Sequence, residues 1–276
     1  MGFFQSGGIL NRRGFFGGTA AFSPKDISGL QLWLDATAGL FDATSGGNAV
    51  TADGSAVARW EDQSGNARHA TQATSGNRAA LKTSVQNSKN VIRFDGTDDF
   101  YSGLSSALVN TNTTNKFSIY IAWIPDLASR QSAYGGGGII RKMTNGGNGD
   151  VDWYFGVRSG GRFAINITGG ANKAITSTTS LTTNTSYVVG LTYDGTASAT
   201  VSDRVKLYLG TTEETKVLDD GSGGWGNGDG EFGRGYTSSS YYFKGDVCEI
   251  IVYDSVLSSV NRTKVSDYLK SRWGIS

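Results

Sequence analysis

The order of apolar and polar residues along the chain is typical of many short β-strands. In LQLWLDA (30–36) leucine occupies positions 30, 32 and 34. RFAINI (162–167) alternates in the same way, with Ala164 and Asn166 on the face that is expected to be solvated. Residues two apart share one face of a strand, so this spacing predicts strands with one face in a core. The runs FSIYIAWI and CEIIVYD are apolar on both faces, which indicates the middle of a sandwich. Further predicted strands cover 57–62, 91–96, 117–124, 151–157, 187–194, 204–210, 215–220 and 243–254.

Glycine-rich turns separate these strands, and one helix closes the chain. The 276 residues include 40 glycines and 2 prolines, with turn segments such as NGGNGD (145–150) and DDGSGGWGNGDG (219–230). The segment LSSVNRTKVSDYLKSRWG has a serine cap at Ser258 or Ser259 and a glycine stop at Gly274, which predicts a helix. We therefore predict an all-β antiparallel sandwich with one C-terminal helix.

The first 24 residues differ from the rest of the chain. Two aromatic pairs, Phe3-Phe4 and Phe15-Phe16, lie among glycines that cannot support a helix. Burying four rings would contribute roughly 1.5–3 kcal/mol each, but ordering the backbone costs about 1–2 kcal/mol per residue. We expect residues 1–24 to form a flexible, extended N-terminal arm that becomes ordered on a neighbouring subunit, with folding back onto its own sandwich as the alternative. Residues 25–276 are expected to form the sandwich domain.

Charge and cysteine content exclude several classes of function. The net charge is +1, from 25 basic and 24 acidic residues, and no basic stripe predicts nucleic-acid binding. No apolar stretch approaches the ~20 residues of a membrane helix, so no membrane partner is expected. The single cysteine, Cys248, lies in an apolar run and is expected to be a buried thiol. Glycines interrupt the N-terminal apolar residues, so we expect Met1 to begin an unprocessed protein made in a cytoplasm.

Four segments together resemble a known family. They are GLQLWLDA (29–36), WEDQSGNARHATQ (60–72), VIRFDGTDDF (91–100) and GDVCEIIVYDSVLSSVNRTKVSDYLKSRWGI (245–275). In this order they resemble the laminin-G-like branch of the concanavalin A-like lectin and glucanase superfamily. The resemblance implies a jelly-roll sandwich of two antiparallel sheets, of a kind found in secreted bacterial proteins and in virion proteins of tailed phages. It fixes a fold rather than a function, and we expect the shared residues to be fold markers rather than catalytic groups.

No catalytic constellation is expected on this scaffold. Glycoside hydrolysis needs two carboxyl groups about 5–5.5 Å or 6.5–9.5 Å apart, and the glucanase string E-x-D-x-x-E does not occur in the chain. Asp246 precedes Glu249 by three residues, which in a regular strand places the two on opposite faces. The only histidine, His69, lies in a polar turn without a nucleophile motif. We therefore predict that the protein is not an enzyme.

Calcium is the one cofactor that the pattern leaves open. DGTDD (95–99) brings Asp95, Asp98 and Asp99 into five residues, and carboxylate oxygens are the ligands that calcium prefers. Asp-Gly turns, however, use the same carboxylates to accept hydrogen bonds from their own backbone. We predict no cofactor, with these three aspartates as the weak calcium candidates.

Sugar binding would depend on exposed aromatic rings that stack on sugar faces. The candidates are Trp153, Tyr154, Trp225, Tyr236, Tyr241 and Tyr242, and Trp225 is flanked only by glycines and polar residues. The alternative is that Trp153 and Tyr154 alternate between core and surface like other strand residues.

Two functions remain open at this point. The first is a non-enzymatic virion structural protein of a tailed phage, a capsid decoration or fibre-head module on the virion surface. It would be a homo-oligomer that residues 1–24 anchor to other virion subunits. The alternative is an extracellular glycan-binding lectin or adhesion module for cell-surface polysaccharide. A decoration protein that also binds glycan would combine the two.

Overall fold

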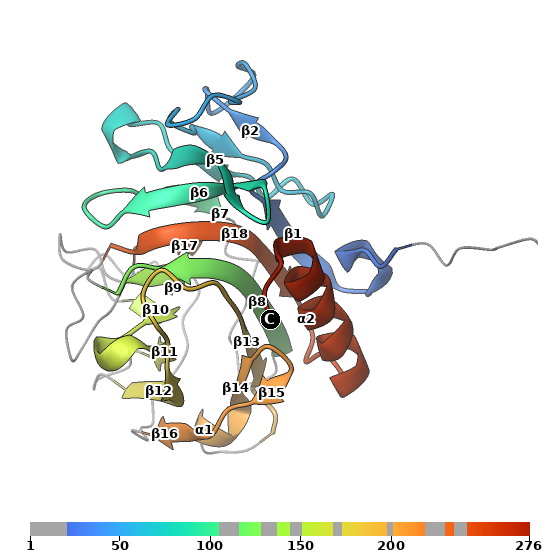
Figure 1. Cartoon of the computed structure of the whole chain (residues 1–276). Coiled ribbons are helices and arrows are strands. Elements are labelled where there is room, and N and C mark those ends of the chain that lie inside the picture. Colours follow the sequence, from blue (N-terminus) through green and yellow to red (C-terminus); the bar gives the residue numbers. More distant parts are fainter. Residues whose placement is uncertain are drawn as a thin grey trace, which may run out of the picture.

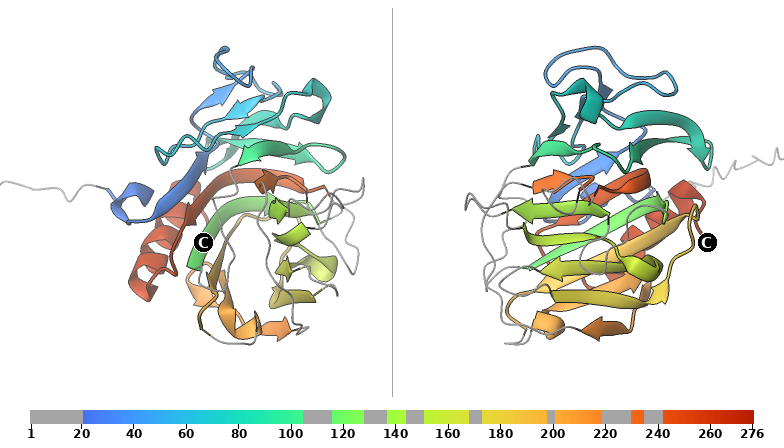
Figure 2. Two further views of the ribbon diagram at one scale, coloured as in Figure 1. Left: turned by 180° about the vertical axis from the view of Figure 1, so that it is seen from behind. Right: turned by 90° about the vertical axis from the view of Figure 1, so that its left-hand side faces the viewer.

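Two antiparallel β-sheets pack face to face in the computed structural model (Figure 1), which describes residues 21–104, 116–127, 137–143, 151–167, 173–197, 201–218, 230–234 and 242–276. In these ranges eight strands form one sheet, with the order β15-β14-β13-β8-β18-β6-β5 and with β1 also paired to β18. Ten strands form the other, in the order β16-β12-β11-β10-β9-β17-β7-β4-β3-β2. Figure 2 shows the two layers from behind and from the side.

The strands of the eight-stranded sheet are β1 (Leu30–Asp35), β5 (Ala80–Gln86), β6 (Lys89–Asp95), β8 (Lys116–Pro125), β13 (Tyr187–Asp194), β14 (Val205–Leu209), β15 (Thr212–Glu213) and β18 (Lys244–Tyr253). Those of the ten-stranded sheet are β2 (Leu40–Phe41), β3 (Arg59–Trp60), β4 (Ala70–Thr71), β7 (Tyr101–Leu104), β9 (Gly138–Met143), β10 (Val151–Val157), β11 (Arg162–Ile167), β12 (Lys173–Ser180), β16 (Lys216–Leu218) and β17 (Gly230–Phe232). The helices are α1 (Val201–Arg204), α2 (Ser259–Trp273) and the short 3-10 turns Pro24–Asp26, Ser75–Asn77 and Ser159–Gly161.

Strand β18 organises the eight-stranded sheet. One edge of β18 pairs with β8, and the other edge is shared between β6 at Lys244–Val247 and β1 at Glu249–Tyr253. A register shift makes Cys248 an extra residue between Val247, which pairs with Trp123, and Glu249, which pairs with Ala122. This break in the alternation decides which β18 side chains face outward.

The core fills the space between the two sheets. Phe117 of β8 stacks on Trp153 of β10, with 5.6 Å between the ring centroids, and Trp123 stacks on Phe243 at 5.7 Å. These four side chains are 0–1% exposed. Each large apolar side chain buried in this way contributes roughly 1.5–3 kcal/mol, so the apolar alternation seen in the sequence is the main source of stability.

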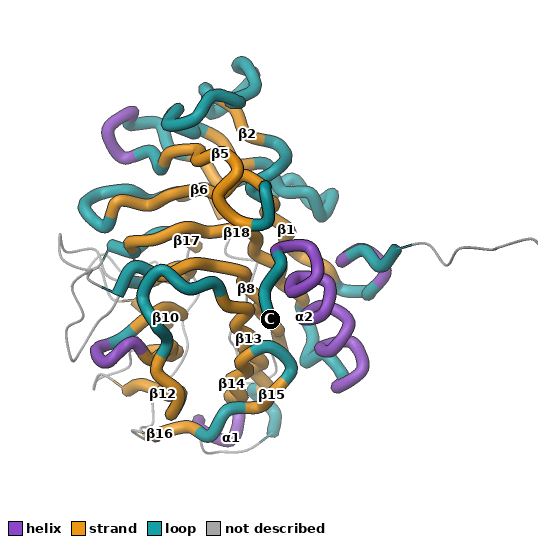
Figure 3. The backbone as a smooth tube through the Cα atoms, in the orientation of Figure 1, coloured by secondary structure: helices purple, strands orange, loops and turns teal. Residues whose placement is uncertain are grey.

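Helix α2 covers the outer face of the eight-stranded sheet beside β1 and β8, and Figure 3 shows it as the long helix of the described chain. Val265, Leu269 and Trp273 recur every four residues and are fully buried. The hydroxyl of Ser258 accepts the N–H of Asn261, and Gly274 ends the helix in the left-handed conformation with φ 62°. None of the described helices is long and apolar enough to cross a membrane.

The predicted sandwich and its terminal helix are confirmed. The predicted strands 151–157, 162–167 and 187–194 coincide with β10, β11 and β13. The expectation of a solvated face on β11 is wrong at Ala164, which is fully buried between its cross-strand neighbours Gly156 and Thr176. Residues 1–20, with Phe3, Phe4, Phe15 and Phe16 of the predicted arm, lie outside the described residues. Close to the predicted boundary, Phe22 packs edge-on against Tyr268 of α2 at 5.8 Å.

Candidate cleft at the ends of three strands

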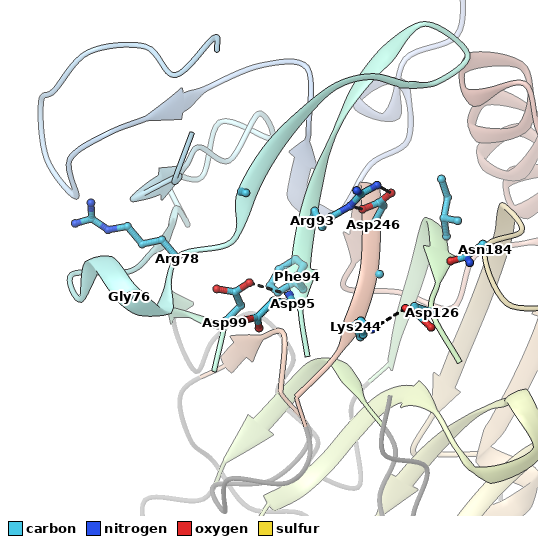
Figure 4. A pocket seen from close by; sticks show the side chains of 13 residues that line it. Gly76, Arg78, Arg93, Phe94, Asp95, Asp99, Asp126, Asn184, Lys244 and Asp246 are labelled. Carbon is cyan, nitrogen blue, oxygen red and sulfur yellow. Dashed lines mark hydrogen bonds and ion pairs between the residues drawn. The ribbon is translucent and has the colours of Figure 1, made fainter. Parts of the chain in front are cut away.

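A cleft of about 610 Å³ opens where β6, β18 and β8 lie side by side (Figure 4). The cleft combines basic, acidic and amide side chains with one partly buried aliphatic residue, Ile124. Its lining residues are Gly76, Arg78, Ala80, Arg93, Phe94, Asp95, Asp99, Ile124, Asp126, Asn184, Lys244, Gly245 and Asp246.

The register of the three strands brings the polar side chains of the cleft together. Lys244 pairs with Asp95 of β6, and Asp246 pairs with Arg93 on one side and with Ile124 of β8 on the other. Partners directly opposite each other point to the same face, so these five side chains form one surface. The intervening residue Val247 pairs with Trp123 and faces the core, which confirms that this surface is the outer one.

Two ion pairs hold the charges in place. The Arg93 guanidinium donates two hydrogen bonds to the Asp246 carboxylate, at 2.6 and 2.7 Å, and these bonds raise the pKa of Arg93. The Lys244 ammonium lies 3.0 Å from the Asp126 carboxylate. The side chains of Arg93 and Lys244 are 48% and 43% exposed, so both cations remain accessible to a ligand. The Lys244–Asp126 pair lies at the surface and contributes only about 0–1 kcal/mol to stability, whereas the Asp246 carboxylate of the other pair is buried.

The turn after β6 forms the acidic wall of the cleft. The Asp95 carboxylate accepts the N–H groups of Thr97 and Asp98, and Asp99 accepts the N–H of Asp95 at 2.9 Å. This confirms the prediction that the aspartates bond their own backbone. Burial raises the pKa of Asp99 to about 7, and the nearby charges of Asp95 and Asp98 act in the same direction.

The same three carboxylates remain the calcium candidates. One oxygen from each of Asp95, Asp98 and Asp99 lies within 4.8 Å of the others. That spacing suits a divalent cation, but two of these carboxylates already accept backbone hydrogen bonds. Calcium binding therefore stays a prediction.

Of the predicted aromatic candidates that the structure describes, Trp153, Tyr154 and Tyr242 do not line this cleft. Trp153 and Tyr154 are each 1% exposed, because Trp153 packs on Phe117 in the core and Tyr154 is covered on the opposite face of β10. Neither ring offers a face at the surface, so neither belongs to the candidate site. Trp225, Tyr236 and Tyr241 lie outside the described residues.

No sequence pattern predicted a site at Arg93, Asp126 or Lys244, and Asp246 was considered only as a partner of Glu249. Each lies at an ordinary position in a strand or just beyond one, and they are up to 153 residues apart. The only local signal is that each is a charged residue close to the end of an apolar strand. Strand order and register, which bring these ends together, cannot be read from the separate segments.

Other residues of the segments that carry the family resemblance build a hydrogen-bonded frame beside the cleft. Glu249 is fully buried and accepts the indole N–H groups of Trp33 at 2.6 Å and Trp273 at 2.7 Å, and the Tyr268 hydroxyl at 2.9 Å. Burial raises the pKa of Glu249 to about 7. This network ties α2 to β1 and β18, which supports the expectation that the shared residues are fold markers.

The loop after β3 is fixed in the same way. The Asp62 carboxylate accepts backbone N–H groups of Trp33, Ser64 and Arg68, and the N–H of Asp62 itself donates to His69 Nδ1 at 3.2 Å. His69 therefore has a structural partner and lies in a hydrogen-bonded loop.

The expected separation of Asp246 and Glu249 is wrong. Cys248 is the extra residue of the register shift, so Asp246 opposite Ile124 and Glu249 opposite Ala122 face the same side of the sheet. Glu249 is nevertheless 0% exposed beneath α2, so it is not a carboxyl group that a substrate reaches. The thiol of Cys248 is fully buried, as predicted, and burial raises its pKa.

Comparison with known proteins supports the fold. A family model described as the concanavalin A-like lectin/glucanases superfamily matches residues 95–260. A search of curated protein sequences found no significant match.

Solved structures with the same fold include catalytic and binding proteins. Trypanosoma rangeli sialidase superposes with a TM-score of 0.55 and 15% identity over 89% of this chain and 33% of the sialidase chain. The binding domain of Paraclostridial Mosquitocidal Protein 1 superposes with a TM-score of 0.54 and 14% identity, over 89% of this chain and 53% of that structure. The ligand-binding domain of botulinum neurotoxin serotype D was solved in complex with N-acetylneuraminic acid. It superposes with a TM-score of 0.54 and 14% identity, over 87% of this chain and 51% of that structure. The chain thus spans about a third of the sialidase and about half of each toxin structure, and the likeness shows the fold alone.

Proposed function

We propose that this chain, which belongs to the concanavalin A-like lectin/glucanase superfamily, is a carbohydrate-binding module without hydrolytic activity. The observation that carries the proposal is the cleft at the ends of β6, β18 and β8. The neurotoxin domain, solved with N-acetylneuraminic acid, is a binding precedent on this fold, although a shared fold does not by itself transfer a ligand.

The chemistry of the cleft suits sugar hydroxyl groups. A hydroxyl both donates and accepts hydrogen bonds, and the cleft offers donors on Arg93 and Lys244 and acceptors on Asp95 and Asp126. Ile124, which lies opposite Asp246 on β8, supplies an apolar patch for the C–H face of a pyranose ring. Because the ion pairs already hold the charged groups in place, little side-chain entropy is lost on binding.

A hydrolytic role is less well supported. Asp99, with its pKa raised to about 7, and the neighbouring Asp95 are the closest approach to an acid and base pair in the cleft. Both carboxylates, however, accept N–H groups of their own turn, and Asp99 is only 6% exposed. In the cleft, Asp246 is bonded to Arg93 and Asp126 to Lys244. Release of reducing sugar from a polysaccharide that the protein binds would contradict this part of the proposal.

The proposal is tested on a broad glycan array, followed by calorimetric titration of the best oligosaccharide. Lys244→Met removes the ammonium group but keeps the stem that packs beside Gly96, and it is expected to weaken binding at least about tenfold by removing a charged hydrogen-bond donor. Lys264→Met, at an exposed position of α2, is the control and is expected to bind like the wild type. Absence of binding to every glycan would refute the function, and equal binding by both variants would refute the site.

The second candidate is a structural role on the surface of a tailed-phage particle. The sequence feature that favours it is the Phe-Gly segment at 1–24, which would anchor the module to other virion subunits as a homo-oligomer. Deleting residues 1–24 should then abolish incorporation into particles and leave glycan binding by the cleft unchanged. Normal incorporation of the truncated protein would rule out anchoring through this segment.

A further inference from the structure

Two arginines share one buried glutamate on the outer face of the ten-stranded sheet. Arg141 of β9 pairs with Glu231 of β17, and the next pair, Ile140 with Phe232, is buried in the core. Because successive strand residues point to opposite faces, Arg141 and Glu231 face away from the core. Arg234, just after β17, reaches the same carboxylate. We call these three residues the arginine cluster.

Both carboxylate oxygens of Glu231 accept hydrogen bonds within the arginine cluster. Arg234 donates to both carboxylate oxygens, at 2.6 and 2.8 Å, and Arg141 donates to Oε2 through Nε at 2.7 Å and through Nη2. Burial alone would raise the pKa of Glu231, but the two guanidinium groups hold it below its usual value. Burial lowers the pKa of Arg141 to about 10, which leaves it protonated at neutral pH. Two cations and one anion leave the cluster one positive charge in excess.

One donor of the arginine cluster has no acceptor. Nη1 of Arg141 is buried and has no hydrogen-bond partner, and the Arg141 side chain is 0% exposed. A buried donor on a charged group is costly to leave unpaired, so a partner from outside the chain is expected there. A ligand that accepts a hydrogen bond and carries negative charge would satisfy this donor and also balance the excess cation. A carboxylate meets both requirements, and its planar oxygens match the guanidinium fork.

The surroundings of the arginine cluster point to a sugar as the carrier of that carboxylate. The Arg234 guanidinium lies 3.8 Å from the Phe100 ring centroid, and the Phe100 and Tyr242 rings lie 6.5 Å apart. Phe100 directly follows Asp99 of the cleft, and the backbone at Gly233 is so close to Asp99 that an added Cβ would lie 2.8 Å from its carbonyl oxygen. The turn that carries Asp99 thus links the arginine cluster, on the outer face of the ten-stranded sheet, to the cleft on the other sheet, and the Phe100 ring of this turn lies against Arg234.

We infer that the arginine cluster binds the carboxylate of an acidic sugar residue, so that the module selects acidic over neutral glycans. The inference rests on the proposed glycan-binding function and names the class of sugar. Arg234, with a side chain 15% exposed, is the member that an arriving ligand meets first, and Arg141 Nη1 is the donor that the ligand satisfies.

The wild-type protein tests the inference with matched pairs of ligands. Tetragalacturonate is titrated against its methyl ester, which has the same shape without the charge, and sialyllactose is titrated against lactose. At least one acidic sugar is expected to bind about tenfold or more tightly than its neutral partner. Equal affinities within both pairs would overturn the inference while the proposed function stood. No binding to these four sugars, together with binding of a neutral glycan on the array, would overturn it equally, whereas an entirely silent array would overturn the proposed function itself.

Variants assign the preference to the arginine cluster. Arg234→Ala removes the more exposed guanidinium and leaves Glu231 paired with Arg141, so it is expected to fold and to lose most of the preference for the acidic sugar. Lys264→Ala removes one positive charge from the exposed face of α2 and should keep the preference. Arg141→Met, checked for folding by its thermal transition, should lose it as well. A full preference retained by Arg234→Ala would show that the carboxylate binds elsewhere.

Discussion

Replacing Asp99 with asparagine tests how the acidic wall of the cleft is held. The Asp99 carboxyl is 6% exposed and accepts the N–H of Asp95, and an asparagine carbonyl oxygen accepts the same bond. Burial raises the pKa of Asp99 from 3.8 to about 7, so the folded protein binds the proton more tightly than the unfolded chain does. The stability that this proton provides is fully present below about pH 3.8 and is lost as the pH rises to about 7. Asparagine resembles the protonated form at every pH.

The size of the effect follows from that difference in pKa. One pKa unit corresponds to about 1.36 kcal/mol, so the two pH units from 5 to 7 set an upper limit of about 2.7 kcal/mol. Solvent around the exposed Asp95 weakens the repulsion, so we expect about 1–2.5 kcal/mol, below that limit. The free energy of unfolding of Asp99→Asn, relative to wild type, should therefore increase by this amount between pH 5 and pH 8.

Urea unfolding followed by tryptophan fluorescence at pH 5 and pH 8, with EDTA present, measures the change. Asp267→Asn, at an exposed position of α2, is the control and should show no such dependence on pH. A difference between Asp99→Asn and wild type that stayed constant with pH, or that became more destabilising at pH 8, would refute the reasoning. It would mean that ionised Asp99 stabilises the turn.

Three further predictions concern the arginine cluster, the frame around Glu249 and the acidic turn of the cleft. Glu231→Gln should lower the free energy of unfolding by about 3–5 kcal/mol, because it leaves Arg141 buried without its counter-ion; a loss below about 1 kcal/mol in urea unfolding would contradict the ion pair. Trp273→Phe keeps an aromatic ring but removes the N–H that donates to Glu249 at 2.7 Å. At pH 8 this substitution should lower the free energy of unfolding by about 1.5–3 kcal/mol, whereas the control Val260→Ala, on the exposed side of α2, should leave it nearly unchanged. Removing divalent cations with EDTA should leave the thermal midpoint unchanged, because the carboxylates of the Asp95–Asp99 turn already accept backbone N–H groups; a midpoint that rises with added calcium would establish the cation site instead.

Much of the fold could be predicted because local patterns determine it. The alternation in 151–157, 162–167 and 187–194 placed β10, β11 and β13 at their observed bounds, and Ser258 and Gly274 marked the ends of α2. The pattern of apolar and polar residues does not predict strands such as β9 (Gly138–Met143) and β12 (Lys173–Ser180). β9 is a short segment beside glycines and β12 is rich in threonine and serine, so neither shows a clear alternation of apolar and polar residues. Pairing with neighbouring strands makes them strands.

The candidate site was less predictable than the fold. The acidic turn at 95–99 was visible, since three carboxylates in five residues are a local pattern. Arg93, Lys244 and Asp126 become neighbours only when β6, β18 and β8 pair. The arginine cluster likewise joins residues 90 positions apart, and the unpaired donor on Arg141 exists only in the folded protein.

The sequence by itself determined the class of fold, the one terminal helix, the buried Cys248 and the hydrogen-bonded turn at 95–99. Each of these depends on residues close together in the chain, where side-chain period and turn chemistry act directly. Only the tertiary structure decided the order and register of the strands, the register shift that turns Glu249 outward beneath α2, and the burial of Trp153 and Tyr154. Those features depend on which distant segment covers each face, and burial, pKa and hydrogen-bond partners follow from that covering.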